Sequence, residues 1–157
     1  MRAILHAADR LNHLLFAMAA DAAMDDVEVE WIDRSDDLLP ALNRSLESGW
    51  LPDVVLVITD GDTAPLDAVA MIDQDPILWP TPIVVASVHP SEDERLRAYA
   101  CGVDWYLPLP DRFSEVVDLL EFLPSRASIA AGIVDGPGVV DRAALDLVEE
   151  IEAFLAA

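Results

Sequence analysis

An aspartate stands where open α/β sheets most often carry chemistry. Asp60 follows the run Val54–Ile58 within Pro52–Gly61, PDVVLVITDG, and a second carboxylate, Asp62, comes two residues later. The run is short, unbroken and rich in β-branched residues, which predicts a central strand of a parallel sheet covered on both faces. Ligands of such sheets bind beyond the carboxyl ends of the strands. Asp60 is therefore the first candidate for a functional residue.

Several kinds of chemistry are excluded by residues that the sequence lacks or spaces wrongly. All nine basic residues are arginines, which excludes Schiff-base chemistry and any mechanism that needs a lysine ammonium. His6, His13 and His89 do not have metal-ligand spacing, and Cys101 is the single cysteine, so no intramolecular disulfide is expected. There is no glycine-rich phosphate loop and no serine in a nucleophile elbow.

The charge of the chain is strongly one-sided. Thirty acidic residues against nine arginines give a formal net charge of −21. A field this negative repels phosphate backbones and anionic lipid, so we expect neither nucleic acid nor a membrane as partner. No stretch of 18 or more apolar residues is present, and no signal peptide is recognised at the start. We therefore expect a cytoplasmic protein.

Apolar blocks alternate with helical patterns five times along most of the chain, which predicts an α/β domain with a parallel sheet between helices. Asp9 or Asn12 is expected to cap the first helix. Ser91-Glu92-Asp93-Glu94 matches a capping box for a later helix, which Gly102 would end. The expected strands are Arg2–Ala7, Val27–Ile32, Val54–Ile58, Ile83–Ser87 and Val103–Leu107.

The pattern changes after Pro124. We predict a domain over residues 1–124, and a linker followed by an amphipathic helix over residues 125–157. Asp141 would cap this helix, which would pack back on the domain, pair with a second copy of the chain or continue into a longer protein. Its apolar stripe consists of Leu145, Val148, Ile151 and Leu155.

A resemblance to a known family is carried by the strand IVVAS, the helix RLRAYACG and the segment VDWYLPLP in the second half, and by VITDGDTAPLDA upstream. These segments are similar to parts of the response-regulator receiver domain, the CheY-like module of two-component signalling. The resemblance covers Arg2 to about Leu123. It implies a flavodoxin-like, doubly wound sheet of five parallel strands in the order 2-1-3-4-5, here with an extra C-terminal helix.

The resemblance also assigns positions. Asp60 falls on the aspartate that receivers phosphorylate, and Ser87 and Tyr106 fall on the two switch positions. Leu109 occupies the place of the lysine that pairs with the acyl phosphate. Pro110 occupies the place of the proline that follows a cis peptide bond.

The departures from the family pattern decide the expected function. Receivers hold Mg²⁺ with an acidic pair at the end of the first strand, where this chain has Ala7-Ala8-Asp9, and Leu109 replaces the lysine. Phosphoryl transfer to a carboxylate needs positive charge and a metal to stabilise the phosphoryl oxygens. The preferred hypothesis is therefore a degenerate receiver, or pseudo-receiver, that is not an enzyme, needs no cofactor and binds a signalling protein such as a kinase or an output domain.

Two alternatives stay open. An atypical response regulator would still be phosphorylated on Asp60, with Asp9 and Asp62 completing a Mg²⁺ site. A flavodoxin-like small-ligand binder or enzyme would have the same layers. For the preferred hypothesis, a homodimer through the fourth helix, fifth strand and fifth helix, or through the C-terminal helix, is a further expectation. Trp79 and Trp105 are candidates to anchor a partner.

Overall fold

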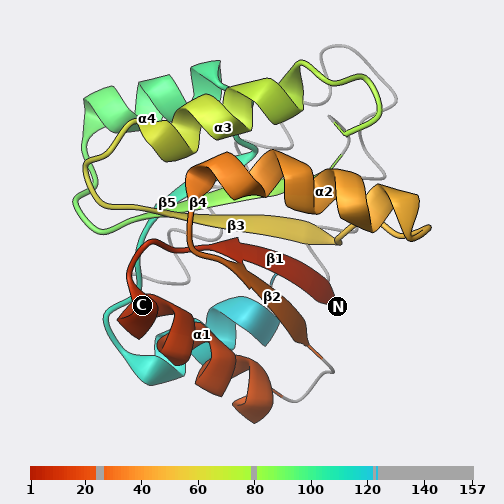
Figure 1. Cartoon of the computed structure of the whole chain (residues 1–157). Helices are drawn as coiled ribbons and strands as arrows, with labels where there is room; N and C mark the ends of the chain where they lie inside the picture. Colours follow the sequence, from red (N-terminus) through yellow and green to blue (C-terminus); the bar gives the residue numbers. More distant parts are fainter. Residues whose placement is uncertain (24–26, 79–80, 122, 124–157) are drawn as a thin grey trace.

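The computed structural model describes residues 1–23, 27–78, 81–121 and 123. A five-stranded parallel sheet with the order β2-β1-β3-β4-β5 lies between two layers of helices (Figure 1). This confirms the predicted flavodoxin-like fold. The predicted linker and C-terminal helix, residues 125–157, lie outside the described residues. The strands are β1 (Arg2–His6), β2 (Glu28–Ile32), β3 (Val54–Thr59), β4 (Ile83–Ser87) and β5 (Trp105–Pro108).

The helices are divided between the two faces of the sheet. One face is covered by α1 and by a helix over residues 113–121, drawn in cyan in Figure 1, and the other by α2, α3 and α4. No helix in the described ranges is both long and apolar enough to cross a bilayer. The labelled helices are α1 (Arg10–Ala22), α2 (Leu38–Glu47), α3 (Ala64–Asp73) and α4 (Glu92–Ala100), with a short 3-10 turn η1 (Ser35–Asp37) before α2.

Two apolar cores result, one on each side of the sheet. Phe16 of α1 packs in the same core as Leu56 of β3, whereas Leu42 of α2 packs with Val55 on the opposite side. Neighbouring residues of one strand thus point to opposite faces, and every residue of β3 is buried. This is why the sequence of β3 is an unbroken apolar run, and the run carries Asp60 to the carboxyl edge of the sheet.

The ends of two helices show how the sequence fixes the local geometry. Asp9 caps α1, because its Oδ1 accepts a hydrogen bond from the Leu11 N–H at 2.9 Å. Gly102 follows α4 with φ +99°, a conformation that favours glycine. The side chain of Asp73 fills the space that a Cβ at this position would need. Both ends agree with the predicted caps.

Candidate functional site

The carboxyl ends of the central strands border a pocket with a volume of about 510 Å³. Asp60 lies in it after β3, together with Asp9 from the start of α1 and Asp62. The structure thus brings together the three aspartates that the sequence nominated. The pocket is lined by His6, Ala8, Asp9, Asn12, Asp33, Arg34, Ser35, Asp36, Ile58, Asp60, Asp62 and Pro65.

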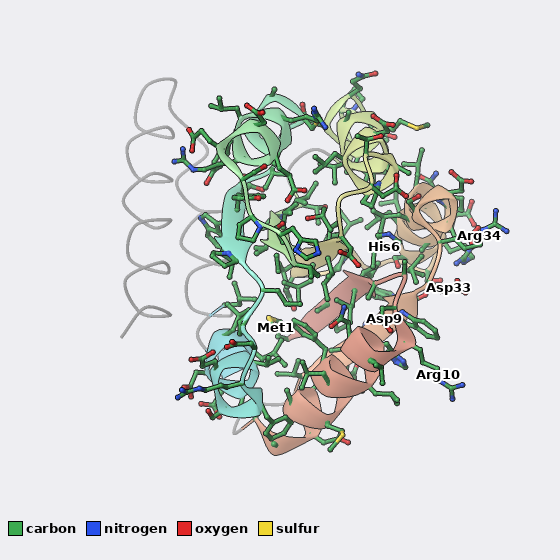
Figure 2. All side chains as sticks on the ribbon, turned by 90° about the vertical axis from the view of Figure 1, so that its left-hand side faces the viewer. Met1, His6, Asp9, Arg10, Asp33 and Arg34 are labelled. Atoms are coloured by element: carbon green, nitrogen blue, oxygen red, sulfur yellow. The ribbon has the colours of Figure 1, made fainter. Side chains whose placement is uncertain are left out.

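His6 and Arg34 are among the lining residues that the sequence did not predict for this site. Figure 2 shows His6 and Arg34 at this end of the sheet with Asp9 and Asp33, while Arg10 points away from them. His6 is 2% exposed, and its Nδ1–H donates to the Ile32 carbonyl at 3.0 Å. Arg34 follows β2 and is largely exposed. Both enter the pocket because β1 and β2 are neighbours in the sheet. The predicted strand order was the signal that could have found these two residues.

The candidate carboxylates are already engaged by the protein itself. Asp9 Oδ1 accepts from the Leu11 N–H, and Asp62 Oδ1 accepts from the Ala64 N–H at 3.1 Å, next to the start of α3. Asp60 Oδ1 lies 3.3 Å from Nε2 of His89. Two of the three therefore serve as helix-end acceptors.

The donor set does not fit the Mg²⁺ ion that receivers hold. Mg²⁺ demands near-octahedral oxygen coordination at short distances. Ala8 lines the pocket but offers no side-chain oxygen, and Asp9 and Asp62 turn an oxygen to backbone N–H groups. Within the described ranges, no three His, Cys, Asp or Glu side chains are placed to hold a metal ion together.

Position 109 supplies no positive charge near Asp60. Nε2 of His89 approaches Asp60, but the two side chains are 75% and 67% exposed, so this contact contributes little in water. Leu109 instead lines a different pocket and packs partly buried against the core that contains Phe16. At position 109 the chain thus has an apolar side chain where the family has its lysine.

The predicted switch residues are both buried. Tyr106 is 3% exposed, and its hydroxyl donates to Oε1 of Glu94 at 2.8 Å and accepts from the Ser91 N–H at 3.3 Å. Burial raises the pKa of the Tyr106 hydroxyl; the adjacent Ser87 hydroxyl opposes this shift, and Glu94 adds to it. Within the part of the chain that the structure describes, Ser87 Oγ nevertheless makes no hydrogen bond of good geometry. Glu94, which the sequence suggested only as a capping residue, is the main partner of Tyr106.

A second pocket, with a volume of about 770 Å³, lies along α4, β5 and the loop that follows β5; we call it the α4–β5 groove. Pro110 lines this groove, and the expectation of a cis peptide bond before it is wrong. The peptide bond before Pro110 is trans, like every peptide bond of the described residues; trans is the more stable isomer of an X–Pro bond. The groove is lined by Val88, Pro90, Ser91, Glu92, Arg95, Tyr106, Pro108, Leu109, Pro110, Asp111 and Glu115.

Solved structures of response regulators have a similar fold. The chain is similar to the Mn²⁺-bound form of the response regulator Rcp1, with 18% identity, a TM-score of 0.65, and coverage of 79% of this chain and 91% of that one. It is also similar to a response regulator receiver domain from Rhodospirillum rubrum, with 17% identity, a TM-score of 0.62, and coverage of 82% and 94%. No protein-family model and no curated protein matches the sequence. The chain therefore has the receiver fold, as the resemblance implied.

Proposed function

We propose that this chain is a receiver-type signalling domain that binds a partner protein and is not phosphorylated on Asp60 by the Mg²⁺-dependent route. The observation that carries the proposal is the engagement of the carboxylates around Asp60. Asp9 and Asp62 each accept a hydrogen bond from a backbone N–H through one carboxylate oxygen, and Ala8 has no side-chain oxygen to offer a metal ion. The site thus keeps the acceptor aspartate without the groups that would activate a phosphoryl donor.

The expected loss of phosphorylation rate is too large for slow but useful phosphorylation of Asp60. Loss of a single group that stabilises transition-state charge commonly costs about 10²–10³ in rate. Here both the metal ligands and the lysine position, Leu109, are altered, so a loss of about 10⁴-fold or more is expected. The pocket itself adds negative charge, since five aspartates line it beside one arginine. An incoming phosphoryl donor would be repelled.

For the partner surface we propose the α4–β5 groove. It combines an apolar floor, to which Val88 and Leu109 contribute, with one cation, Arg95. A kinase or an output domain is the proposed occupant, and a second copy of the chain is the alternative. The amphipathic helix that the sequence predicts within residues 125–157 offers another route to a homodimer. None of these surfaces requires modification of Asp60.

Treatment with a small phosphodonor tests the proposal. We expect no phosphorylated species when the full chain is incubated with acetyl phosphate or phosphoramidate and Mg²⁺, because the transition-state charge is not neutralised. Intact-mass spectrometry checks this against a phosphorylatable receiver domain treated in the same mixture. Isothermal titration with Mg²⁺ alone is expected to show no heat of specific binding.

The Asp60→Asn variant is the matched control for this experiment. Stoichiometric phosphorylation that is present in the unmodified chain and lost in Asp60→Asn would overturn the proposal. It would favour the atypical regulator in which Asp9 and Asp62 release their backbone partners to hold Mg²⁺. Phosphorylation that survives the substitution would point to another acceptor and would leave Asp60 without a role in the reaction.

A further inference from the structure

Glu94 makes only one of the two hydrogen bonds expected of a capping box. Its backbone N–H donates to Ser91 Oγ at 3.1 Å, so Ser91 caps α4 as predicted. In a capping box the acidic side chain would return to the N–H of the capping residue. Here the Ser91 N–H donates to the Tyr106 hydroxyl at 3.3 Å instead. The carboxylate of Glu94 is therefore turned away from its own helix.

That carboxylate joins three elements of the fold at one atom. Oε1 of Glu94 accepts from the Thr59 hydroxyl at 2.9 Å and from the Tyr106 hydroxyl at 2.8 Å. Thr59 ends β3 and is fully buried, Tyr106 lies in β5, and Glu94 belongs to the first turn of α4. The N-terminus of a helix favours a negative charge at this place. A single oxygen thus connects the centre of the sheet with its edge.

We propose that Glu94 is a positioning residue that holds Tyr106 in its buried conformation and connects the end of β3, next to Asp60, with the α4–β5 groove. This device makes the shape of the groove depend on a fixed carboxylate rather than on a phosphoryl group. This inference about Glu94 rests on the proposed function in one respect, namely that the α4–β5 groove is the partner surface.

Glu94 can hold Tyr106 in place because buried hydrogen-bonding groups need partners. If the Glu94 carboxylate is removed, the hydroxyls of Thr59 and Tyr106 both lose the acceptor that they share. Buried polar groups are nearly always paired, and leaving one unpaired is costly. Tyr106 can regain a partner by rotating towards water, because it already lines the groove. Thr59, buried in the strand, cannot.

The same contacts give the Asp60 loop a route to the groove. Thr59 directly precedes Asp60, and its carbonyl accepts from the Val88 N–H at 2.9 Å. A displacement of this loop would move the Thr59 hydroxyl, then Glu94, then Tyr106. Contact alone does not establish such coupling, so it needs a direct measurement.

Fluorine NMR provides the test, because the chain has only two tyrosines. The full chain is labelled with 3-fluorotyrosine, and the Tyr106 resonance is assigned as the one missing in Tyr106→Phe. In Glu94→Ala we expect the H₂O/D₂O isotope shift of this resonance to rise from near zero to the value of an exposed tyrosine. Glu94→Gln is expected to stay close to the unmodified chain, because its amide oxygen still accepts a hydrogen bond.

Asp93→Ala is the matched control, since it removes an exposed acid from the same helical turn. A Tyr106 resonance that stays protected in Glu94→Ala, or becomes equally exposed in Asp93→Ala, would overturn the proposal. If Glu94→Ala does not fold by circular dichroism, Glu94→Leu, which keeps apolar bulk without an acceptor, replaces it under the same criteria.

The coupling is tested separately from phosphorylation. Asp60→Asn is expected to shift the Tyr106 resonance, and the shift should disappear when Thr59→Val removes the connecting hydroxyl. A shift of equal size in both backgrounds would refute the route through Thr59. These readouts use no phosphodonor, so phosphorylation of Asp60 would end the proposed function without deciding the role of Glu94.

Discussion

Replacing Trp105 with alanine is expected to lower the free energy of unfolding by about 3–5 kcal/mol, the usual range for a large aromatic residue deleted from a core. Trp105 is 1% exposed and is the largest fully buried side chain of the described residues. It packs from β5 into the core that Phe16 and Leu120 also form. The resulting cavity would lie between the sheet and two helices, which cannot close it without moving apart.

Two further variants show whether the loss comes from packing. Trp105→Phe should cost clearly less, because it retains a ring and removes an indole N–H that has no hydrogen-bond partner among the described residues. Trp50→Ala should cost clearly less than Trp105→Ala, since this residue is only partly buried and one face of its ring contacts Arg2, 4.9 Å from the ring centroid. Urea unfolding followed by circular dichroism measures all three. Equal losses for Trp105→Ala and Trp50→Ala would contradict the burial argument.

Asp104→Asn is expected to stabilise the protein by about 1–3 kcal/mol at pH 7.5 and to have little effect near pH 4. Desolvation raises the pKa of Asp104 from 3.8 to about 6; the Ile83 N–H, which donates to its Oδ2 at 2.8 Å, opposes this, and nearby Asp73 adds to it. The asparagine retains an acceptor for the Ile83 N–H without the cost of a half-buried charge.

The direction with pH follows from the sign of this shift. The folded chain binds the Asp104 proton more tightly than the unfolded chain does, so the contribution of Asp104 to the stability of the unmodified chain is fully present below about pH 4 and is lost as the pH rises through about 6. The advantage of Asp104→Asn over the unmodified chain is therefore small below about pH 4 and complete above about pH 6. The measurement is the difference in unfolding free energy between variant and unmodified chain across pH 4–8. The matched control is Asp111→Asn, which removes the same charge from an exposed position; parallel behaviour of the two variants would contradict the assignment.

The strands were predictable from the sequence because burial on both faces leaves a direct mark. The predicted strand Ile83–Ser87 is β4 without change, and Val54–Ile58 differs from β3 by one residue. Asp9 as a cap and Gly102 as a helix end followed from local chemistry that needs no distant partner. These features depend on neighbours within a few positions along the chain.

The site was less predictable, because it depends on directions that side chains take in three dimensions. Glu94 has local sequence features of a capping residue, yet its carboxylate reaches Thr59, 35 positions away. His6 was set aside for lack of metal spacing, although it borders the pocket of Asp60. Trp105 was a candidate to anchor a partner from a strand end, but the structure buries it. Trp79 lies outside the described residues.

The two margins of the sheet restrict how any partner can attach. β2 is one margin and presents Glu28 and Glu30 to solvent, while β5, at the other, ends with the exposed Pro108, which has no N–H to donate. Like charges and proline both discourage a foreign strand from extending a sheet. Recognition that relies on backbone pairing is therefore disfavoured at either margin, and so is fibril-like stacking of copies. These margins favour binding through side-chain surfaces instead.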